Sequence, residues 1–219
     1  SPFDCSEMPL QVHSRFMIEV SVPHTGLLRL GLATAYSVIF WSRATEDIPA
    51  AEIARTAEEQ GWFGDISSSR VRYVVRQLQK RFPYPARKLL GFQPRAGSGQ
   101  DALVCHWHLQ LNDPLYRHYT SHYLLGCWSG PTTSVTLDGT EQWVRGRPSA
   151  REWKANTQRR MASGLMSAAT EAGLMSKTGR EERELKLPGV QSSDRDYLKE
   201  LILLAGVENG APYLASVGR

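Results

Sequence analysis

The sequence has few cysteines and no long apolar run. Its three cysteines, Cys5, Cys105 and Cys127, are widely spaced and form no CxxC pair. This spacing argues against a disulfide scaffold or a structural zinc module and favours a reducing, cytoplasmic environment. The most apolar window, residues 27–41, contains Arg29 and is shorter than the roughly 20 residues that cross a bilayer. We therefore expect no membrane span, and we also see no signal-peptide pattern.

Motifs of catalysis are missing as well. The sequence contains no phosphate-binding loop, no GxGxxG and no GxSxG. Lys177-Thr178-Gly179 matches one fragment of penicillin-binding enzymes, but their SxxK and SDN elements are absent. The carboxylates lie mostly on expected solvated helices and form no obvious acid–base pair. We therefore expect a protein without enzymatic activity and without a cofactor.

Acidic residues are absent from one long stretch. Residues 66–100 carry eight basic side chains and no acid, whereas residues 45–65 carry six acids and one basic residue. The formal net charge of +4 hides this polarity. A helix pair with this distribution presents one strongly positive surface, which is typical of proteins that bind the phosphates of nucleic acids.

Apolar periodicity predicts a mainly α protein with at most short β hairpins. We expect helices at residues 27–42, 50–60, 67–82, 115–128, 149–172 and 194–205, a strand at 16–22, and a hairpin that pairs 174–176 with 183–187. Residues 102–111 are ambiguous, because their alternation fits a wing hairpin with residues 89–95 and their length also fits a helix. Gly130 and Pro131 favour a boundary, so we expect an N-terminal domain 1–128 and a C-terminal domain 129–219.

The clearest expected helix spans residues 67–82. Its apolar stripe consists of Val71, Val74, Val75, Leu78 and Phe82. Three serines and no acid occupy its first turn, which leaves the amide end of the helix open to an outside anion. With helix 50–60 it predicts a helix-turn-helix. The connection of about six residues is longer than the usual tight turn, which favours a winged-helix or looser variant.

A second basic segment spans residues 145–160, with six basic residues and one acid, Glu152. The capping box Ser149-Ala150-Arg151-Glu152 predicts the start of a helix that Gly173 ends. Two interpretations stay open for this segment: a second contact surface for nucleic acid, or the solvated face of a structural helix.

Both basic segments together predict binding of double-stranded DNA, mainly through phosphates. Arginine can also bind guanine, and glutamine can bind adenine. The expected contact residues are Ser67, Ser68, Ser69, Arg70, Arg72, Tyr73, Arg76, Gln77, Lys80, Arg81, Arg87, Lys88, Arg151, Lys154, Arg159 and Arg160.

Histidines and cysteines gather between residues 105 and 127. His118 and His122 have the i, i+4 spacing of metal sites, but Tyr119 stands where an HExxH motif has its acid. We interpret the whole group as polar and aromatic positions near the core and expect no metal site. A metal-dependent enzyme is the alternative.

Three stretches resemble the BrxA family of bacteriophage-exclusion (BREX) defence systems. They are residues 27–63, residues 66–82, and the segment from Trp153 to Leu165 with Ala172-Gly173-Leu174. The resemblance covers about residues 27–205. It implies a small, mainly helical, non-enzymatic protein that binds double-stranded DNA beside the methyltransferase, phosphatase-like and ATPase components of a phage-resistance locus. Because the family is helical where residues 102–111 alternate, we favour the helical alternative there.

Two other functions fit the same residues. A winged-helix transcriptional regulator or plasmid replication initiator would prefer one operator or repeated site. A protein-interaction subunit would instead present its basic face to an acidic partner protein. Duplex binding separates these classes, because only the DNA-binding proteins retain nucleic acid at low salt.

Overall fold

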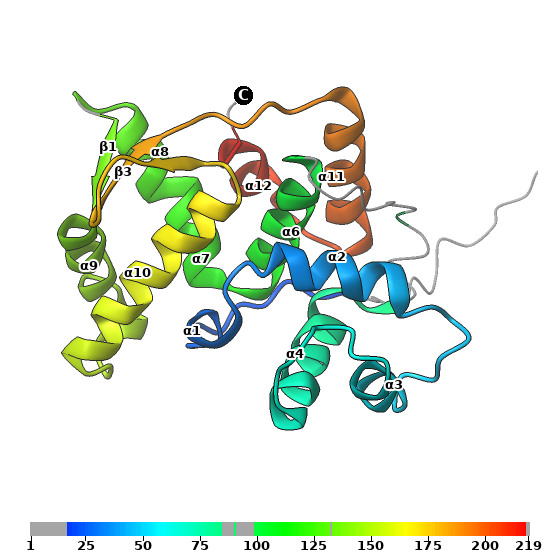
Figure 1. Cartoon of the computed structure of the whole chain (residues 1–219). Coiled ribbons are helices and arrows are strands. Elements are labelled where there is room, and N and C mark those ends of the chain that lie inside the picture. The colour runs from blue at the N-terminus through cyan, green and yellow to red at the C-terminus, as the bar shows by residue number, and fades with distance from the viewer. Residues whose placement is uncertain (1–16, 85–89, 91–98, 132, 218–219) are drawn as a thin grey trace, which may run out of the picture.

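The structure is a computed structural model that describes residues 17–84, 90, 99–131 and 133–217. Within these ranges the protein is mainly helical with one small antiparallel sheet (Figure 1), as the sequence predicts. None of the described helices has the length and apolarity that would let it span a membrane.

The helices of the first part of the chain are followed by a mixed second part. The first part holds α1 (Leu27–Leu30), α2 (Thr34–Arg43), α3 (Ile53–Glu59), α4 (Ser68–Arg81), α6 (Gly99–Asn112), α7 (Pro114–His118), a π-helical turn (Tyr119–Tyr123) and α8 (Leu124–Trp128). The second part holds β1 (Ser134–Thr136), α9 (Leu137–Arg145), a 3-10 turn (Pro148–Ala150), α10 (Ala155–Glu171), β2 (Met175–Lys177), β3 (Glu182–Leu185), α11 (Ser192–Leu204) and α12 (Ala211–Ala215). The predicted domain division after residue 128 coincides with the end of α8 and stays a prediction.

Helix α6 is the centre of the core. Every residue from Leu103 to Leu111 is buried, and α2, α4, α10 and α11 pack against this helix. A helix that is surrounded by others has no polar face, so its sequence loses the helical period. The helical alternative for residues 102–111 is therefore correct. No wing hairpin forms with residues 103–109, and its other expected strand, 89–95, lies largely outside the described residues.

The expected helix 27–42 is broken in two. Gly31 has φ +62° and Ala33 has φ +55°, left-handed values that end α1 before α2 begins. The expected strand at 16–22 is also wrong for the described residues 17–22, which are irregular. Their backbone is held against the core by a hydrogen bond from the Val20 amide to the Leu111 carbonyl (2.7 Å).

Helices α3 and α4 form the predicted pair. The apolar stripe of α4 is buried, and Gly61, with φ +60°, follows the end of α3. Helix α3 begins at Ile53, three residues later than expected, because residues 50–52 form turns. The helix-turn-helix and winged-helix interpretations of this pair both stay predictions.

The start of α10 differs from the predicted capping box. Residues 148–150 form a 3-10 turn that begins with Pro148, and α10 begins only at Ala155. Gly173, with φ +79°, ends the helix region as predicted. The predicted hairpin is confirmed as β2 and β3, which pair Met175 with Leu185, and β1 adds to the other edge of β3 in a strand order β1-β3-β2.

Candidate nucleic-acid interface

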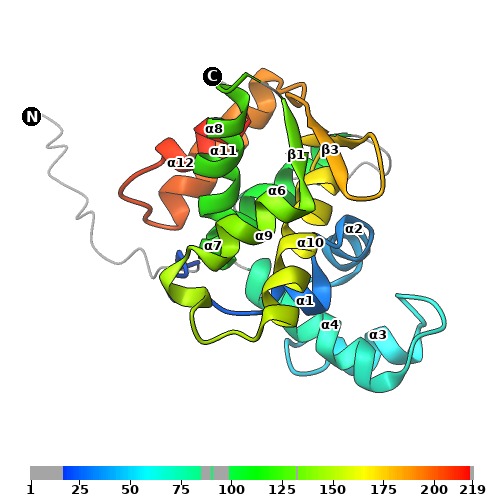
Figure 2. The same cartoon turned by 90° about the vertical axis from the view of Figure 1, so that its left-hand side faces the viewer.

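The starts of the two basic helices lie on the same side of the molecule. In Figure 1 the first turns of α4 and α10 both project downward, and α1 lies between the two helices. The view in Figure 2, turned by 90°, again has α1 between α4 and α10. Leu27 of α1 approaches Gly164 of α10, and a Cβ built at that glycine would stand 3.6 Å from a leucine methyl.

The amide end of α4 is only partly capped. The Ser67 hydroxyl accepts a hydrogen bond from the Arg70 amide (3.3 Å) and lies 3.1 Å from the Ser69 hydroxyl. Within the described ranges no acceptor is bonded to the amides of Ser68 and Ser69. Free amides at a helix start carry partial positive charge and favour an anion.

Tyr73 organises the basic face of α4. The guanidinium carbons of Arg70, Arg76 and Arg29 lie 5.5, 5.7 and 5.9 Å from the centre of its ring. Arg70 also donates a hydrogen bond to the Arg29 carbonyl (2.8 Å). The face of an aromatic ring attracts cations. The Tyr73 ring can therefore hold these three positive charges near one another, although no carboxylate of the described residues pairs with them. Sequence reasoning missed Arg29, whose only signal was a single charge within an apolar window.

Arg76 and Lys80 continue this face toward the end of α4. Both side chains are exposed, and neither forms an ion pair with any residue in the described part of the chain. Arg72 points the other way and lies 3.5 Å from Glu58 of α3, a weak and exposed contact. Cations without acidic partners are available to an external anion. Arg76 and Lys80 are therefore candidates for contacts with the phosphates of a nucleic acid.

The position of Arg81 differs from the prediction that this residue is exposed and contacts DNA. It is 6% exposed, and its guanidinium donates to the carbonyls of Leu32 (2.5 Å) and Gly31 (3.0 Å). Burial lowers the pKa of this guanidinium. The sequence pattern gave Arg81 an exposed position at the end of a basic helix, but the break between α1 and α2 buries it as a structural group. Arg81 is thus no part of the exposed positive surface.

The start of α10 contributes a smaller set of cations. Arg151, Lys154 and Arg160 are exposed and form no ion pair with the residues that the structure describes. Arg160 precedes Gly164 by four residues, so both lie on one helix face, the face that packs against α1. By helical spacing, Arg160 therefore lies on the side of α10 that faces α1.

Arg159 is a second correction. Its guanidinium lies 3.1 Å from Asp138, 2.9 Å from Glu141 and 2.9 Å from Glu181, and these hydrogen bonds raise its pKa. A cation that already contacts three carboxylates attracts a polyanion less strongly than an unpaired cation does. One residue along the helix turns a side chain by about 100°, which is why Arg159 and Arg160 differ. The expected contacts Arg87 and Lys88 lie outside the described residues.

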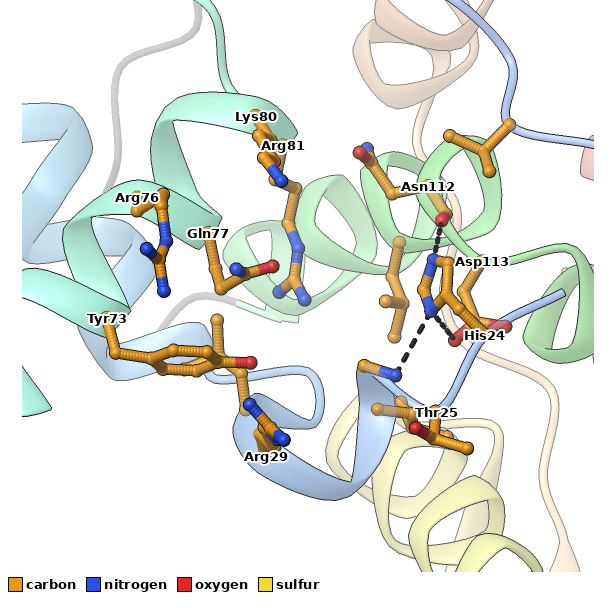
Figure 3. A pocket seen from close by; sticks show the side chains of 15 residues that line it. His24, Thr25, Arg29, Tyr73, Arg76, Gln77, Lys80, Arg81, Asn112 and Asp113 are labelled. Atoms are coloured by element: carbon orange, nitrogen blue, oxygen red, sulfur yellow. Dashed lines mark hydrogen bonds and ion pairs between the residues drawn. The ribbon is translucent and has the colours of Figure 1, made fainter. Parts of the chain in front are cut away.

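A cleft opens beside this face, between α1, α4 and the end of α6. It has a volume of about 590 Å³, and Tyr73, Arg76, Gln77 and Lys80 line it from α4. Figure 3 shows the Arg76 guanidinium and the Gln77 amide pointing into the space from one side, with Arg29 opposite. Most of the predicted polar face of α4 therefore converges on one hollow.

The histidines serve the core and an aromatic cluster. His106 and His108 are fully buried and hydrogen-bonded to tyrosine hydroxyls. The rings of His118 and His122 stack 4.2 Å apart, and Arg147 donates a hydrogen bond to the first of them (3.0 Å). In the described ranges, no three His, Cys, Asp or Glu side chains come together closely enough to hold a metal ion.

Neither a comparison of the chain with known protein families nor a search of curated proteins gives a match. A function for this chain is therefore inferred from its own residues, and above all from cations that have no acidic partner among the described residues.

Proposed function

We propose that this protein is a non-enzymatic double-stranded DNA-binding protein that holds the phosphate backbone against α4, α1 and the start of α10. The observation that carries the proposal is that Arg76 and Lys80 are exposed and that their contacts in the described structure include no carboxylate. Acidic neighbours are at hand, because α3 carries Glu58 and Glu59 next to α4, yet Arg76 and Lys80 pair with neither. Leaving one face unpaired favours an external polyanion.

Phosphate contacts supply most of the proposed affinity. The groups concerned are guanidinium, ammonium and helix-start amide groups, which bind phosphate oxygens and carry no sequence information by themselves. Gln77 and Arg76 also have side chains that can bind base edges. We therefore propose that the protein binds duplexes of largely any sequence. In this respect it differs from a regulator that recognises one operator.

The wider role in the proposal is phage defence within a BREX-type system. It comes from the resemblance of residues 27–63, 66–82 and 153–174 to the BrxA family, and the helical fold of these segments is compatible with it. In that setting the protein would act in the cytoplasm beside DNA-modifying and ATP-hydrolysing partners. The separation of the two basic segments by α1 suits a long ligand such as a duplex better than a short acidic loop.

Binding of random-sequence duplexes across a salt series tests the proposal. About six neutralised phosphates give a slope of log K against log salt near −5. Similar affinities for unrelated duplexes support a sequence-tolerant binder, and a strong preference for one selected site supports the regulator instead. Failure to retain any duplex at low salt contradicts the proposal and favours an acidic protein partner.

A further inference from the structure

We propose that the cleft between α1, α4 and α6 binds a single nucleotide, with its phosphate among the arginines and its base toward Tyr73 and Gln77. The nucleotide could be free in solution or an unpaired nucleotide of bound DNA, and the second source rests on the proposed function. Three features of the cleft carry the inference: its charge, its mixed lining and its size.

The cleft is strongly positive. Arg29, Arg76, Lys80 and Arg81 all line it. Arg81 is the most informative, because it is buried and no carboxylate of the described residues lies within ion-pair distance of it. Two of its donors are used by the carbonyls of Gly31 and Leu32, and a guanidinium carries five N–H groups in all. A buried charge that has no carboxylate of the described residues in contact, and only Asp113 and Glu171 at longer range, is costly, and an anion in the cleft would lower that cost.

One acid also lines the cleft, but its side chain is buried. Asp113 is 1% exposed, and one of its oxygens accepts a hydrogen bond from the Tyr116 amide (3.0 Å). Burial raises the pKa of this carboxyl. His24 lies between Asp113 and solvent, with Nδ1 3.9 Å from the other carboxylate oxygen. A ligand in the cleft is therefore shielded from the Asp113 carboxylate. The arginine and lysine side chains of the lining, in contrast, face the ligand.

The lining also suits a planar, partly polar group. The Tyr73 ring and the Gln77 amide stand beside the cations, and Leu30 and Leu109 add apolar surface. Figure 3 shows the Tyr73 hydroxyl and the Gln77 amide directed into the same space as the guanidinium groups of Arg76 and Arg81. Aromatic rings and side-chain amides are the groups with which proteins stack and hydrogen-bond unpaired bases. A phosphate alone would leave these groups unused.

The size of the cleft fits this ligand. Its volume of about 590 Å³ falls within the range of about 300–1,000 Å³ that is usual for small-molecule sites. Such a space takes one nucleotide and excludes a duplex. The duplex would instead lie across the mouth, where Arg76 and Lys80 are exposed. The nucleotide and the duplex would thus both contact Arg76 and Lys80, but only the nucleotide would contact the walls inside the cleft.

Calorimetric titration of the full chain tests the inference with three probes: 2′-deoxyadenosine 5′-monophosphate, deoxyadenosine and inorganic phosphate. We expect the nucleotide to bind at least about tenfold more tightly than either part, since only the nucleotide uses both halves of the lining. Nucleotide binding no tighter than that of phosphate overturns the inference.

A cleft-filling variant locates the binding. Thr25 lines the cleft, is half-buried, and its hydroxyl has no hydrogen-bond partner within the described ranges. Thr25→Trp should lower nucleotide affinity at least about tenfold while duplex affinity stays unchanged, and Thr25→Val should change neither. Unchanged nucleotide binding in a folded Thr25→Trp protein overturns the inference. If this variant melts early, Gln77→Leu replaces it, and undiminished nucleotide affinity there is equally contrary.

The two sources are separated by DNA probes. A duplex with one unpaired nucleotide should bind wild-type protein more tightly than its fully paired counterpart, and Thr25→Trp should abolish that difference if DNA supplies the nucleotide. Equal binding of the two duplexes together with tight binding of the mononucleotide supports the free source. If the protein binds duplexes but not the mononucleotide, this inference is contradicted and the proposed function is not. If it binds the mononucleotide but not duplexes, only the proposed function is contradicted.

Discussion

Arg81 of α4 donates a hydrogen bond of 2.5 Å to the backbone carbonyl of Leu32, which lies between α1 and α2. This contact joins the basic helix to the break in the apolar segment. It also orients α1, whose Arg29 completes the group of cations around Tyr73. A residue that the sequence assigns to the exposed DNA-binding face is thus buried and supports that face from within.

We predict that Arg81→Met destabilises the fold without changing the salt dependence of duplex binding. The substitution leaves the carbonyls of Gly31 and Leu32 without their donors in a buried place, which costs about 2–4 kcal/mol of unfolding free energy. Urea unfolding measures the loss. Arg72→Ala is the control, because an exposed side chain with one weak contact should change stability by less than about 0.5 kcal/mol. Equal stability of the two variants contradicts the structural role of Arg81.

We predict that acid destabilises the protein through His106 and His108. Burial lowers the pKa of each imidazole to about 3, well below the value of about 6.5 in an unfolded chain. The unfolded state therefore binds protons first as the pH falls. The contribution of these two histidines to stability is constant above about pH 7 and declines between about pH 6.5 and pH 3, by up to about 1.4 kcal/mol per pH unit for each histidine.

Urea unfolding at several pH values measures this decline. His106→Gln should flatten the curve even if it lowers stability at neutral pH, since the substituted side chain no longer titrates. Ser42→Ala is the control, because this exposed serine does not titrate and its loss should leave the slope unchanged. A wild-type curve that is flat between pH 6.5 and pH 4 contradicts the buried, neutral state of both rings.

Arg159 and Arg160 should behave differently although they are neighbours. Arg160→Ala should weaken duplex binding and reduce the salt slope by about one, because it removes one free cation. Arg159→Ala should lower the melting temperature and leave the slope unchanged, because its charge is already used by Asp138, Glu141 and Glu181. Filter binding and thermal melting distinguish the two, and identical slopes for both variants would contradict the assignment.

Tyr73 should act through the arginines that surround it. Tyr73→Leu removes three cation–ring contacts, each worth about 0.5–1 kcal/mol at an exposed site, and should reduce duplex affinity severalfold. Tyr73→Phe retains the ring and should bind nearly as well as wild type. Comparable losses in both variants would instead indicate that the hydroxyl, and not the ring, contacts the ligand.

The sequence predicts well those elements whose signal is local. The stripe of α4 and the end of α3 at Gly61 follow from helical spacing and one left-handed glycine. The order of β2 and β3 follows from short alternating segments around a turn. These features are decided by neighbours within a few residues, so one sequence is enough.

Other features depend on contacts between distant segments and could not be predicted. Helix α6 has no polar face because four helices surround it, so its sequence fits strand and helix equally. In the sequence, Arg81 lies in the same basic segment as Arg76, and Arg159 lies in the same basic segment as Arg160. The neighbouring residues therefore do not show which arginine of each pair is exposed and unpaired. The partners of Arg81 and Arg159, Leu32 and Asp138, lie far away in the sequence, and only the fold brings each pair together.

The most direct test of the account compares two matched double variants. Arg76 and Lys80 are an exposed i, i+4 pair on α4, and Arg195 and Lys199 are exposed at the same spacing on α11, on the opposite side of the molecule (Figure 1), where Lys199 also lies 3.2 Å from Asp196. We predict that Arg76→Ala with Lys80→Ala reduces the slope of log K against log salt by about two, while Arg195→Ala with Lys199→Ala leaves it unchanged. Equal slopes for the two double variants would contradict the claim that the face of α4 is where this protein holds DNA.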